Sequence, residues 1–249
     1  MSAPHAARAR ASLRRHARNA MITLLHLDAS ARPGRSGLHG HGSHSRRLSA
    51  RFVARWRDLR PADSVVYRDL GQRPPAPVDA AWVHAAFTPP TARSPWMQQR
   101  LAESDMLVDE LLQADVIVAG VPMYNFGPPA TFKAYVDNIV RVGRTFGFDR
   151  SRAGEPYWPL LAELGKTLVL VTSRGDYGYA AGERLAPQDH LGPWVRTAFG
   201  YIGIGDVHEV AVEYDEFGGE RLQQSLERAS ADIDALAERL AQQHPRRAA

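Results

Sequence analysis

Apolar stretches with strand spacing alternate with stretches of helical spacing along most of the chain. Short apolar runs rich in Val, Ile and Leu predict strands, and apolar residues three or four positions apart predict amphipathic helices. The predicted strands are residues 22–28, 64–70, 115–120, 166–172 and 207–214. The predicted helices are residues 45–59, 95–113, 131–142, 188–202 and 220–243, the second of them preceded by Ser94 as an N-cap.

This alternation predicts an α/β fold with a five-stranded, parallel, doubly wound sheet and helices on both faces. The run at residues 166–172 is almost entirely apolar, as expected for a strand buried on both faces. Two irregular stretches, residues 71–90 and 148–164, follow the second and third predicted strands and are positioned to border a pocket. The first of them, which is rich in Pro and Ala, is expected to contain a partial helix. Because no repeat or linker interrupts the pattern, we expect a single domain over residues 21–249.

The composition is that of one globular domain and excludes several kinds of site. The chain has 249 residues, of which 44% are hydrophobic, enough for one full core. It contains no cysteine, which excludes disulfides, thiolate metal sites and a cysteine nucleophile and fits a reducing compartment. The longest apolar runs have about eight residues, whereas a helix needs roughly 20 to span a bilayer. We therefore expect a cytoplasmic protein without a membrane segment.

The basic charge lies mostly in the first 20 residues. The formal net charge is +4, and five arginines with no acidic residue fall within residues 1–20, so the rest of the chain carries about −1. Charge concentrated in a tail does not indicate a nucleic-acid surface. We expect residues 1–20 to be a disordered basic extension. A transit peptide, a nucleic-acid or membrane arm, and a start at Met21 are the alternatives.

Polar loops follow the first, third and fourth predicted strands, and in a parallel sheet such loops meet at one edge. The first loop begins at Ser30 and ends with Ser43, His44 and Ser45 at the start of a helix. Serine hydroxyls and free N–H groups at a helix N-terminus can bind a phosphate monoester, although Ser43 or Ser45 can equally be a simple N-cap. Residues 40–45 also imitate a glycine-rich dinucleotide motif, but they lie too far beyond the strand end for that turn.

Three histidines, His39, His41 and His44, crowd the same loop. Alternating His and Gly can bind a metal ion, but no carboxylate lies among these residues. We therefore expect a solvated insertion and no metal site.

The second and third loops carry groups that suit a flat heteroaromatic ring. The second loop, Met-Tyr-Asn-Phe at residues 123–126, offers ring faces and an amide directly after a buried strand, and the prolines that follow stiffen its exit. The third loop, Ser-Arg-Gly-Asp at residues 173–176, offers a hydroxyl, a cation and a row of N–H groups. The alternatives are a packed hydrophobic loop and an ordinary turn at Gly175.

Together these loops resemble those of the FMN-dependent NADH:quinone oxidoreductases, also called FMN-dependent NADH-azoreductases, which have a flavodoxin-like fold. The resemblance is carried by residues 123–126, by Lys-Ala-Tyr-Val-Asp-Asn-Ile-Val-Arg-Val-Gly-Arg-Thr-Phe at 133–146, by Ser-Arg-Gly at 173–175 and by Ser-His-Ser-Arg-Arg-Leu at 43–48. It covers residues 21–243, and it implies a single flavodoxin-like domain that binds FMN.

The resemblance also implies which residues hold the cofactor. The first loop would bind the FMN phosphate, the second would lie along the isoalloxazine ring, and the third would contact the other edge of the ring. The implied FMN-binding residues are Ser30, Ser43, His44, Ser45, Met123, Tyr124, Asn125, Phe126, Ser173, Arg174, Gly175 and Asp176. The implied walls of the substrate pocket are Tyr124, Phe126, Phe146, Tyr177 and Tyr179, each of which can instead belong to the core or to a dimer interface.

Two departures from the family pattern bear on this site. The first loop is longer than usual, so Ser36 is an alternative to Ser43 at the phosphate. Asp176 stands where many relatives have a second glycine, and an acid beside the flavin would disfavour its reduced, anionic form.

The implied activity is hydride transfer from NADH or NADPH to FMN, and then from reduced FMN to a quinone or an azo compound. Both substrates would use one site in turn, with ping-pong kinetics, and no side chain need be catalytic because FMN carries the chemistry. The resemblance implies a homodimer as well. The alternatives are a non-enzymatic flavodoxin-like electron carrier and an FMN-binding regulator.

Overall fold

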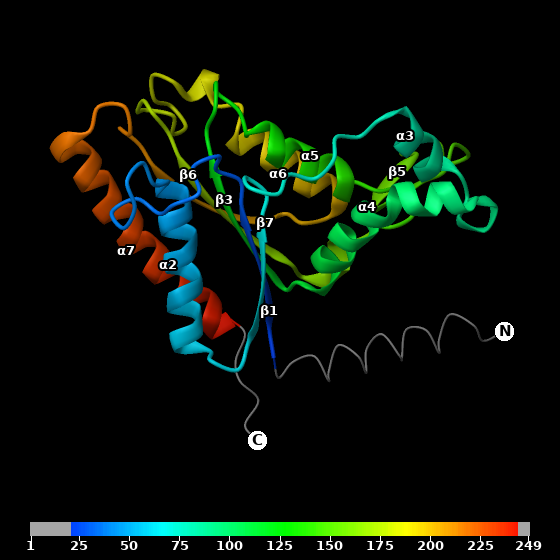
Figure 1. Ribbon diagram of the computed structural model, residues 1–249, viewed down its shortest axis with the longest axis horizontal. Helices are drawn as coiled ribbons and strands as arrows, with labels where there is room; N and C mark the ends of the chain where they lie inside the picture. Colours follow the sequence, from blue (N-terminus) through cyan, green and yellow to red (C-terminus); the bar gives the residue numbers. More distant parts are fainter. Residues whose placement is uncertain (1–20, 244–249) are drawn as a thin grey trace.

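Five parallel strands form one sheet at the centre of the molecule, in the order β2-β1-β3-β6-β7 (Figure 1). The computed structural model describes residues 21–243, so the expected basic extension at residues 1–20 lies outside it. The strands are β1 (Thr23–Asp28), β2 (Ser64–Asp69), β3 (Val116–Pro122), β6 (Thr167–Ser173) and β7 (Asp206–Val212). All four neighbouring pairs are parallel. The predicted fold class is confirmed, because the chain order 2-1-3-4-5 is the flavodoxin-like order.

Helices cover both faces of this sheet (Figure 1). They are α2 (His44–Leu59) and α7 (Gly219–Gln243) on one face, and α4 (Pro95–Gln113), α5 (Ala130–Ile139) and α6 (Gly192–Ile202) on the other. Side chains that alternate along a strand enter different cores. Val118 packs with Trp56 and Ile233 on the α2–α7 face, whereas Ile117 packs with Leu111 on the opposite face. β3 and β6 are therefore buried at every position.

On the side of the molecule away from α2 lies a lateral extension (Figure 1). In it α3 (Ala80–Phe87) packs against α4, and the antiparallel hairpin of β4 (Phe146–Phe148) and β5 (Tyr157–Pro159) packs against α6. The sequence predicted irregular chain with a partial helix here, so the hairpin is a correction. Its strands are held by aromatic packing: the rings of Phe148 and Tyr157 stack 4.7 Å apart. Gly147 is needed because a Cβ there would lie 2.0 Å from the Trp158 ring.

The remaining short helices are of the 3-10 type: η1 (Pro90–Ala92), η2 (Ala162–Leu164) and η3 (Ala186–Gln188). The helix predicted from residue 188 is thus η3 followed by α6, which begins at Gly192. The helix predicted over residues 131–142 ends earlier, at Ile139. Ser94 stands at the N-cap of α4, as predicted, but its hydroxyl makes no capping hydrogen bond and is buried without a partner among the described residues.

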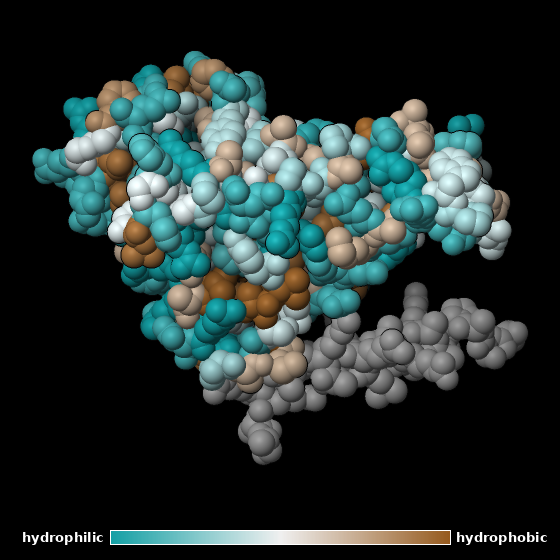
Figure 2. Space-filling view, in the orientation of Figure 1, coloured by the Kyte–Doolittle hydropathy of each residue, from teal (hydrophilic) through white to brown (hydrophobic). Residues whose placement is uncertain are grey.

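Polar residues cover most of the face seen in Figure 2, and apolar side chains gather near the lower ends of β1 and β2. No helix within residues 21–243 is both long enough and apolar enough to cross a bilayer. The carboxyl ends of the five strands point toward the top of Figure 1, and the loops that leave them form one rim. That rim is where open α/β sheets bind their ligands.

Candidate functional site

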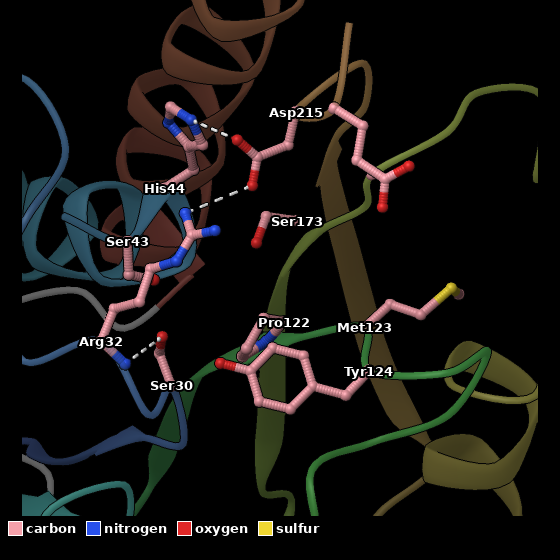
Figure 3. Close-up of a pocket in the computed structure, with 11 residues that line it drawn as sticks. Ser30, Arg32, Ser43, His44, Pro122, Met123, Tyr124, Ser173 and Asp215 are labelled. Atoms are coloured by element: carbon pink, nitrogen blue, oxygen red, sulfur yellow. Dashed lines mark hydrogen bonds and ion pairs between the residues drawn. The ribbon is translucent and has the colours of Figure 1, made fainter. Parts of the chain in front are cut away.

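A cavity of about 310 Å³ opens at this rim, and four loops from different parts of the chain line it (Figure 3). The loops follow β1, β3, β6 and β7. The lining residues are Ser30, Arg32, Ser43, His44, Pro122, Met123, Tyr124, Ser173, Gly175, Asp215 and Glu216. The structure therefore brings the three predicted loops together and adds a fourth.

Strand pairing brings these loops together. The ladder continues one residue beyond the strands, with the N–H of Ala29 donating to the carbonyl of Gly120 at 2.9 Å and that of Met123 donating to Ser173 at 2.8 Å. On the far side, the N–H of Arg174 donates to the carbonyl of Val212 at 2.8 Å. Because four neighbouring strands end in register, their first loop residues lie side by side along the rim.

One end of the cavity can accept an anion. Ser43 is the N-cap of the 16-residue helix α2, and its Oγ accepts from the N–H of Arg46 at 3.3 Å. The first N–H groups of a helix have no partner within it and carry a partial positive charge. Ser43 caps the helix and lines the cavity, so its two predicted roles are compatible. Ser45 is fully buried behind it and contacts the Ser43 hydroxyl at 3.0 Å.

A buried polar network beneath the rim fixes the position of Ser30. Arg46 is buried and makes hydrogen bonds of 2.8 Å and 2.6 Å to the two carboxylate oxygens of Asp69. Its Nη2 also donates to the carbonyl of Ser30 at 2.8 Å. The Ser30 hydroxyl accepts from the N–H of Arg32 at 3.2 Å and faces the cavity (Figure 3).

Three charged or ionisable side chains meet above this end of the cavity (Figure 3). The Nε2 of His44 lies 3.1 Å from Oδ1 of Asp215, and Nη1 of Arg32 lies 3.6 Å from Oδ2 of the same carboxylate. On its other side the His44 ring contacts the Ser36 hydroxyl, with 2.8 Å between Nδ1 and Oγ. The hydrogen bond from His44 lowers the pKa of Asp215 below its ordinary value. Ser36 is thus joined to His44 and does not line the cavity.

The second loop makes a tight turn that presents Met123 and Tyr124 to the cavity. Tyr124 and Gly127 exchange backbone hydrogen bonds of 2.9 Å and 3.1 Å, and the two residues between them have left-handed backbones, with φ of 47° at Asn125 and 70° at Phe126. The Tyr124 hydroxyl accepts from the N–H of Ala31 at 3.2 Å, which ties the first two loops together. Asn125 and Phe126 are exposed at the turn and do not line the cavity.

The third loop contributes Ser173 and Gly175, but the side chain of Arg174 turns away from the cavity. The Arg174 guanidinium is buried, where it donates to Asp189 at 2.9 Å and to Glu209 at 2.8 Å. Burial raises the pKa of Glu209, although the nearby guanidinium opposes this shift. Buried acids therefore hold the Arg174 side chain away from the cavity lining, and a contact of Arg174 with the flavin stays a prediction.

The remaining aromatic candidates lie outside the cavity lining. Phe146 packs against Tyr201 in the lateral extension, with ring centroids 5.2 Å apart, and Tyr179 lies beneath the Arg174 guanidinium at 5.1 Å. Tyr177 stacks on Tyr214 at 4.6 Å. Of the five predicted pocket walls, only Tyr124 lines the cavity. A role for the other four in binding a substrate stays a prediction.

Asp176, the departure noted in the sequence, also lies outside the lining. Its carboxylate pairs with Arg184, and this hydrogen bond lowers the pKa of Asp176. The acid is therefore balanced by a neighbouring cation. Among residues 21–243 no group of three or more His, Cys, Asp or Glu side chains is placed to hold a metal ion.

Comparisons with known proteins agree with this geometry. A family model described as "Flavodoxin-like fold" matches residues 23–237. The FMN-dependent NADH:quinone oxidoreductase 2 of Idiomarina loihiensis is 43% identical over 220 residues, which are 88% of this chain and 91% of the relative. The chain belongs to the family of FMN-dependent NADH:quinone oxidoreductases. The resemblance stated from the sequence is thus confirmed.

Other family members and solved structures extend the match. The FMN-dependent NAD(P)H:quinone oxidoreductase 1 of Pseudomonas aeruginosa is 44% identical over 199 residues, 80% of this chain and 93% of the relative. The azoreductase of Bacillus anthracis str. Sterne has the same fold, with a TM-score of 0.75 and 21% identity over 88% of this chain and 100% of that one. An FMN-dependent NADH-azoreductase of Bacillus anthracis str. Ames Ancestor, solved in complex with FMN, also has a TM-score of 0.75, at 18% identity, and covers 89% of this chain and 100% of that one.

The site has charged residues that the sequence did not single out, namely Arg32, Asp215 and Glu216. Asp215 and Glu216 follow β7, whose carboxyl end lies beside that of β6 in the sheet. Ligands bind at the carboxyl edge of an open α/β sheet, and this rule applies to the loop after β7 as well as to the loops after β1, β3 and β6. The order of the strands, which places β7 next to β6, would have been needed to find these two acids. Arg32 lay within a loop that was considered, but only the serines and histidines of that loop were weighed.

Proposed function

We propose that this protein is an FMN-dependent oxidoreductase that transfers hydride from NADH or NADPH to quinones and azo compounds. The observation that carries the proposal is one cavity with an anion-accepting end and a wall made of a methionine side chain and a tyrosine ring. Ser30 and Ser43 lie at the anion-accepting end, and Met123 and Tyr124 form the wall. The family membership favours this enzymatic activity over an electron carrier or a regulator.

The residues present fit FMN. Its phosphate would bind the Ser30 and Ser43 hydroxyls and the N–H groups at the start of α2, since a helix N-terminus stabilises negative charge. The ring would lie against Met123 and Tyr124, with the backbone around Gly175 at its edge. FMN, when bound, supplies the hydride chemistry, and the protein supplies binding, orientation and electrostatics.

The chain's own contribution is to hold these groups before the ligand arrives. Two hydrogen bonds fix two walls of the cavity relative to each other. One joins Arg46 to the Ser30 carbonyl, and the other joins the N–H of Ala31 to the Tyr124 hydroxyl. Backbone N–H groups of the third loop would stabilise negative charge at the edge of the ring. Because these donors lie on the ends of a rigid sheet, binding requires little rearrangement.

Nicotinamide and acceptor would use the exposed face of the bound ring in turn. We place Phe126, Tyr177, Phe146 and Tyr179 as candidate walls for these substrates. Phe126 lies in the same loop as Met123 and Tyr124, which line the cavity. We also propose a homodimer, supported by large exposed apolar side chains on α3 and α4, among them Val83, Phe87, Trp96 and Met106. The absence of cysteine is compatible with a cytoplasmic location.

The visible absorption spectrum of the purified protein tests the proposal. We expect a flavin spectrum, or uptake of one FMN per chain by the apoprotein with quenching of FMN fluorescence, and oxidation of NADH or NADPH when a quinone is added. An electron carrier would bind FMN without being reduced by NADH. A colourless protein that leaves FMN fluorescence unchanged would contradict the proposal.

A further inference from the structure

The cavity places a carboxylate beside the end where a phosphate would bind. A phosphate monoester carries roughly −1.5 to −2 charges near pH 7, so a neighbouring carboxylate should repel it. Asp215 lines the cavity together with Ser30 and Ser43, and its lowered pKa keeps it ionised. Coulomb repulsion alone would therefore make Asp215 unfavourable for a phosphorylated ligand.

The contacts of Asp215 suggest a different role. Its two oxygens engage two side chains of the first loop and α2, with His44 Nε2 at 3.1 Å and Arg32 Nη1 at 3.6 Å. An ionised carboxylate can only accept hydrogen bonds, so the His44 nitrogen that faces it must carry the hydrogen. The Ser36 hydroxyl, which can donate or accept, engages the other ring nitrogen at 2.8 Å. Both nitrogens of the imidazole are thereby fixed in direction.

The Arg32 side chain is held by fewer contacts than the His44 ring. Its side chain is 52% exposed, and the ion pair to Asp215 is the one contact of its guanidinium that appears among the described residues. A long, exposed side chain loses much rotational freedom when it is held in one place. Asp215 is therefore what keeps a cation above the serine end of the cavity before a ligand binds.

We propose that Asp215 is a positioning residue that holds Arg32 and His44 over the serine end of the cavity, and thereby selects flavins that end in a phosphate monoester. We call these three residues the phosphate clasp. The inference rests on the proposed FMN-binding function and goes beyond it by assigning phosphate specificity to an acid. Arg32 would contact the phosphate. The two ring nitrogens of His44 engage Asp215 and Ser36, so His44 would hold the carboxylate in place, and Asp215 would act through Arg32.

Glu216 provides a matched control, because it lies next to Asp215 and also lines the cavity. Within the described residues its carboxylate has no ion pair or side-chain hydrogen bond. Neutralising it removes the same charge from the same wall without disturbing the clasp. The proposal therefore predicts that, of the two changes, only the one at Asp215 weakens FMN binding.

The experiment titrates apoprotein with FMN and with riboflavin, which lacks the phosphate, and follows the quenching of flavin fluorescence. We expect Asp215→Asn to weaken FMN binding about tenfold and to leave riboflavin binding unchanged. We expect Glu216→Gln to leave FMN binding unchanged or to tighten it. In a variant that combines Arg32→Met with His44→Gln, adding Asp215→Asn should tighten FMN binding, since only repulsion then remains.

Riboflavin serves as the internal control for folding, because a misfolded cavity would lose both ligands. If Asp215→Asn tightens FMN binding or leaves it unchanged, the clasp does not exist. If it weakens both flavins equally, Asp215 only shapes the cavity and the inference is wrong. If the wild-type protein binds neither flavin, the proposed function itself fails, which the wild-type titration alone reveals.

Discussion

His44 and Asp215 lie 171 residues apart in the chain, yet the imidazole and the carboxylate approach to 3.1 Å at the rim of the sheet. The contact joins the first turn of α2 to the loop after β7. It exists because β1, β3, β6 and β7 are neighbours whose carboxyl ends share one rim. The edge strand β7 thus belongs to the site, although the sequence pattern pointed only to the loops after three inner strands.

The pair should make stability depend on pH in the acid range. The hydrogen bond from His44 lowers the pKa of Asp215 below its ordinary 3.8. A carboxylate with a lowered folded pKa stabilises the fold above its unfolded pKa, and this contribution is lost as pH falls through the folded value. Wild-type Tm should therefore exceed that of Asp215→Asn at about pH 6, and the difference should shrink below about pH 4. A difference that stays constant down to about pH 2 would contradict the linkage.

Ser43 should contribute separately to stability and to FMN binding. It caps α2, so Ser43→Ala should lower the free energy of unfolding by about 1 kcal/mol, whereas Ser43→Gly should lower it by only a few tenths. Both variants lose the hydroxyl and should weaken FMN binding by a similar amount, about 1 kcal/mol. Urea unfolding and FMN titration of the two variants check this. If Ser43→Gly binds FMN like the wild type, Ser43 is only a cap.

Phe126 lies in a left-handed conformation that costs a residue with a Cβ about 1–2 kcal/mol. Phe126→Gly should therefore stabilise the protein by about 1 kcal/mol, while it raises KM for the quinone if the ring forms a wall of the acceptor site. Phe126→Ala removes the same ring but keeps the strain, so it should raise KM without stabilising the fold. Thermal unfolding and steady-state kinetics separate the two effects. A destabilised glycine variant would show that the ring packs in the fold.

The amide of Asn125 is predicted to bond the edge of the ring. Asn tolerates the left-handed backbone observed here, and Gly does so at no steric cost. Asn125→Gly therefore deletes the amide and keeps the turn, and we expect FMN and riboflavin to bind more weakly by the same 1–3 kcal/mol or so. Asn125→Leu should weaken both further, because Leu strains the turn. Unchanged affinity in Asn125→Gly would remove Asn125 from the site.

The sequence predicted the sheet because its strands are short runs of branched apolar residues separated by helical patterns. It did not predict the hairpin of β4 and β5, since strands of three residues show no period and depend on stacked rings such as Phe148 and Tyr157. α3 was predicted only as a partial helix, because its eight residues follow a stretch rich in proline. Local pattern therefore determined the core elements, and tertiary packing determined the extension.

In the candidate site, too, local pattern predicted some positions, whereas others depend on tertiary packing. Ser30, Ser43 and Tyr124 follow strands or begin a helix, so their place on the rim was predictable from the chain order. The position of the Arg174 side chain was not predictable from the chain order. It is buried by Asp189 and Glu209, which lie on elements distant in sequence. Asp215 carries no local motif, and only the strand order brings it to the cavity.

The most direct test of the proposed function is anaerobic stopped-flow mixing of the FMN-loaded protein with NADH, followed by a quinone. We expect the visible flavin absorption to bleach within the turnover time and to return when the quinone is added, because one site serves both substrates in turn. Flavin that stays oxidised in the presence of NADH and of NADPH would contradict an oxidoreductase and favour a carrier or a regulator.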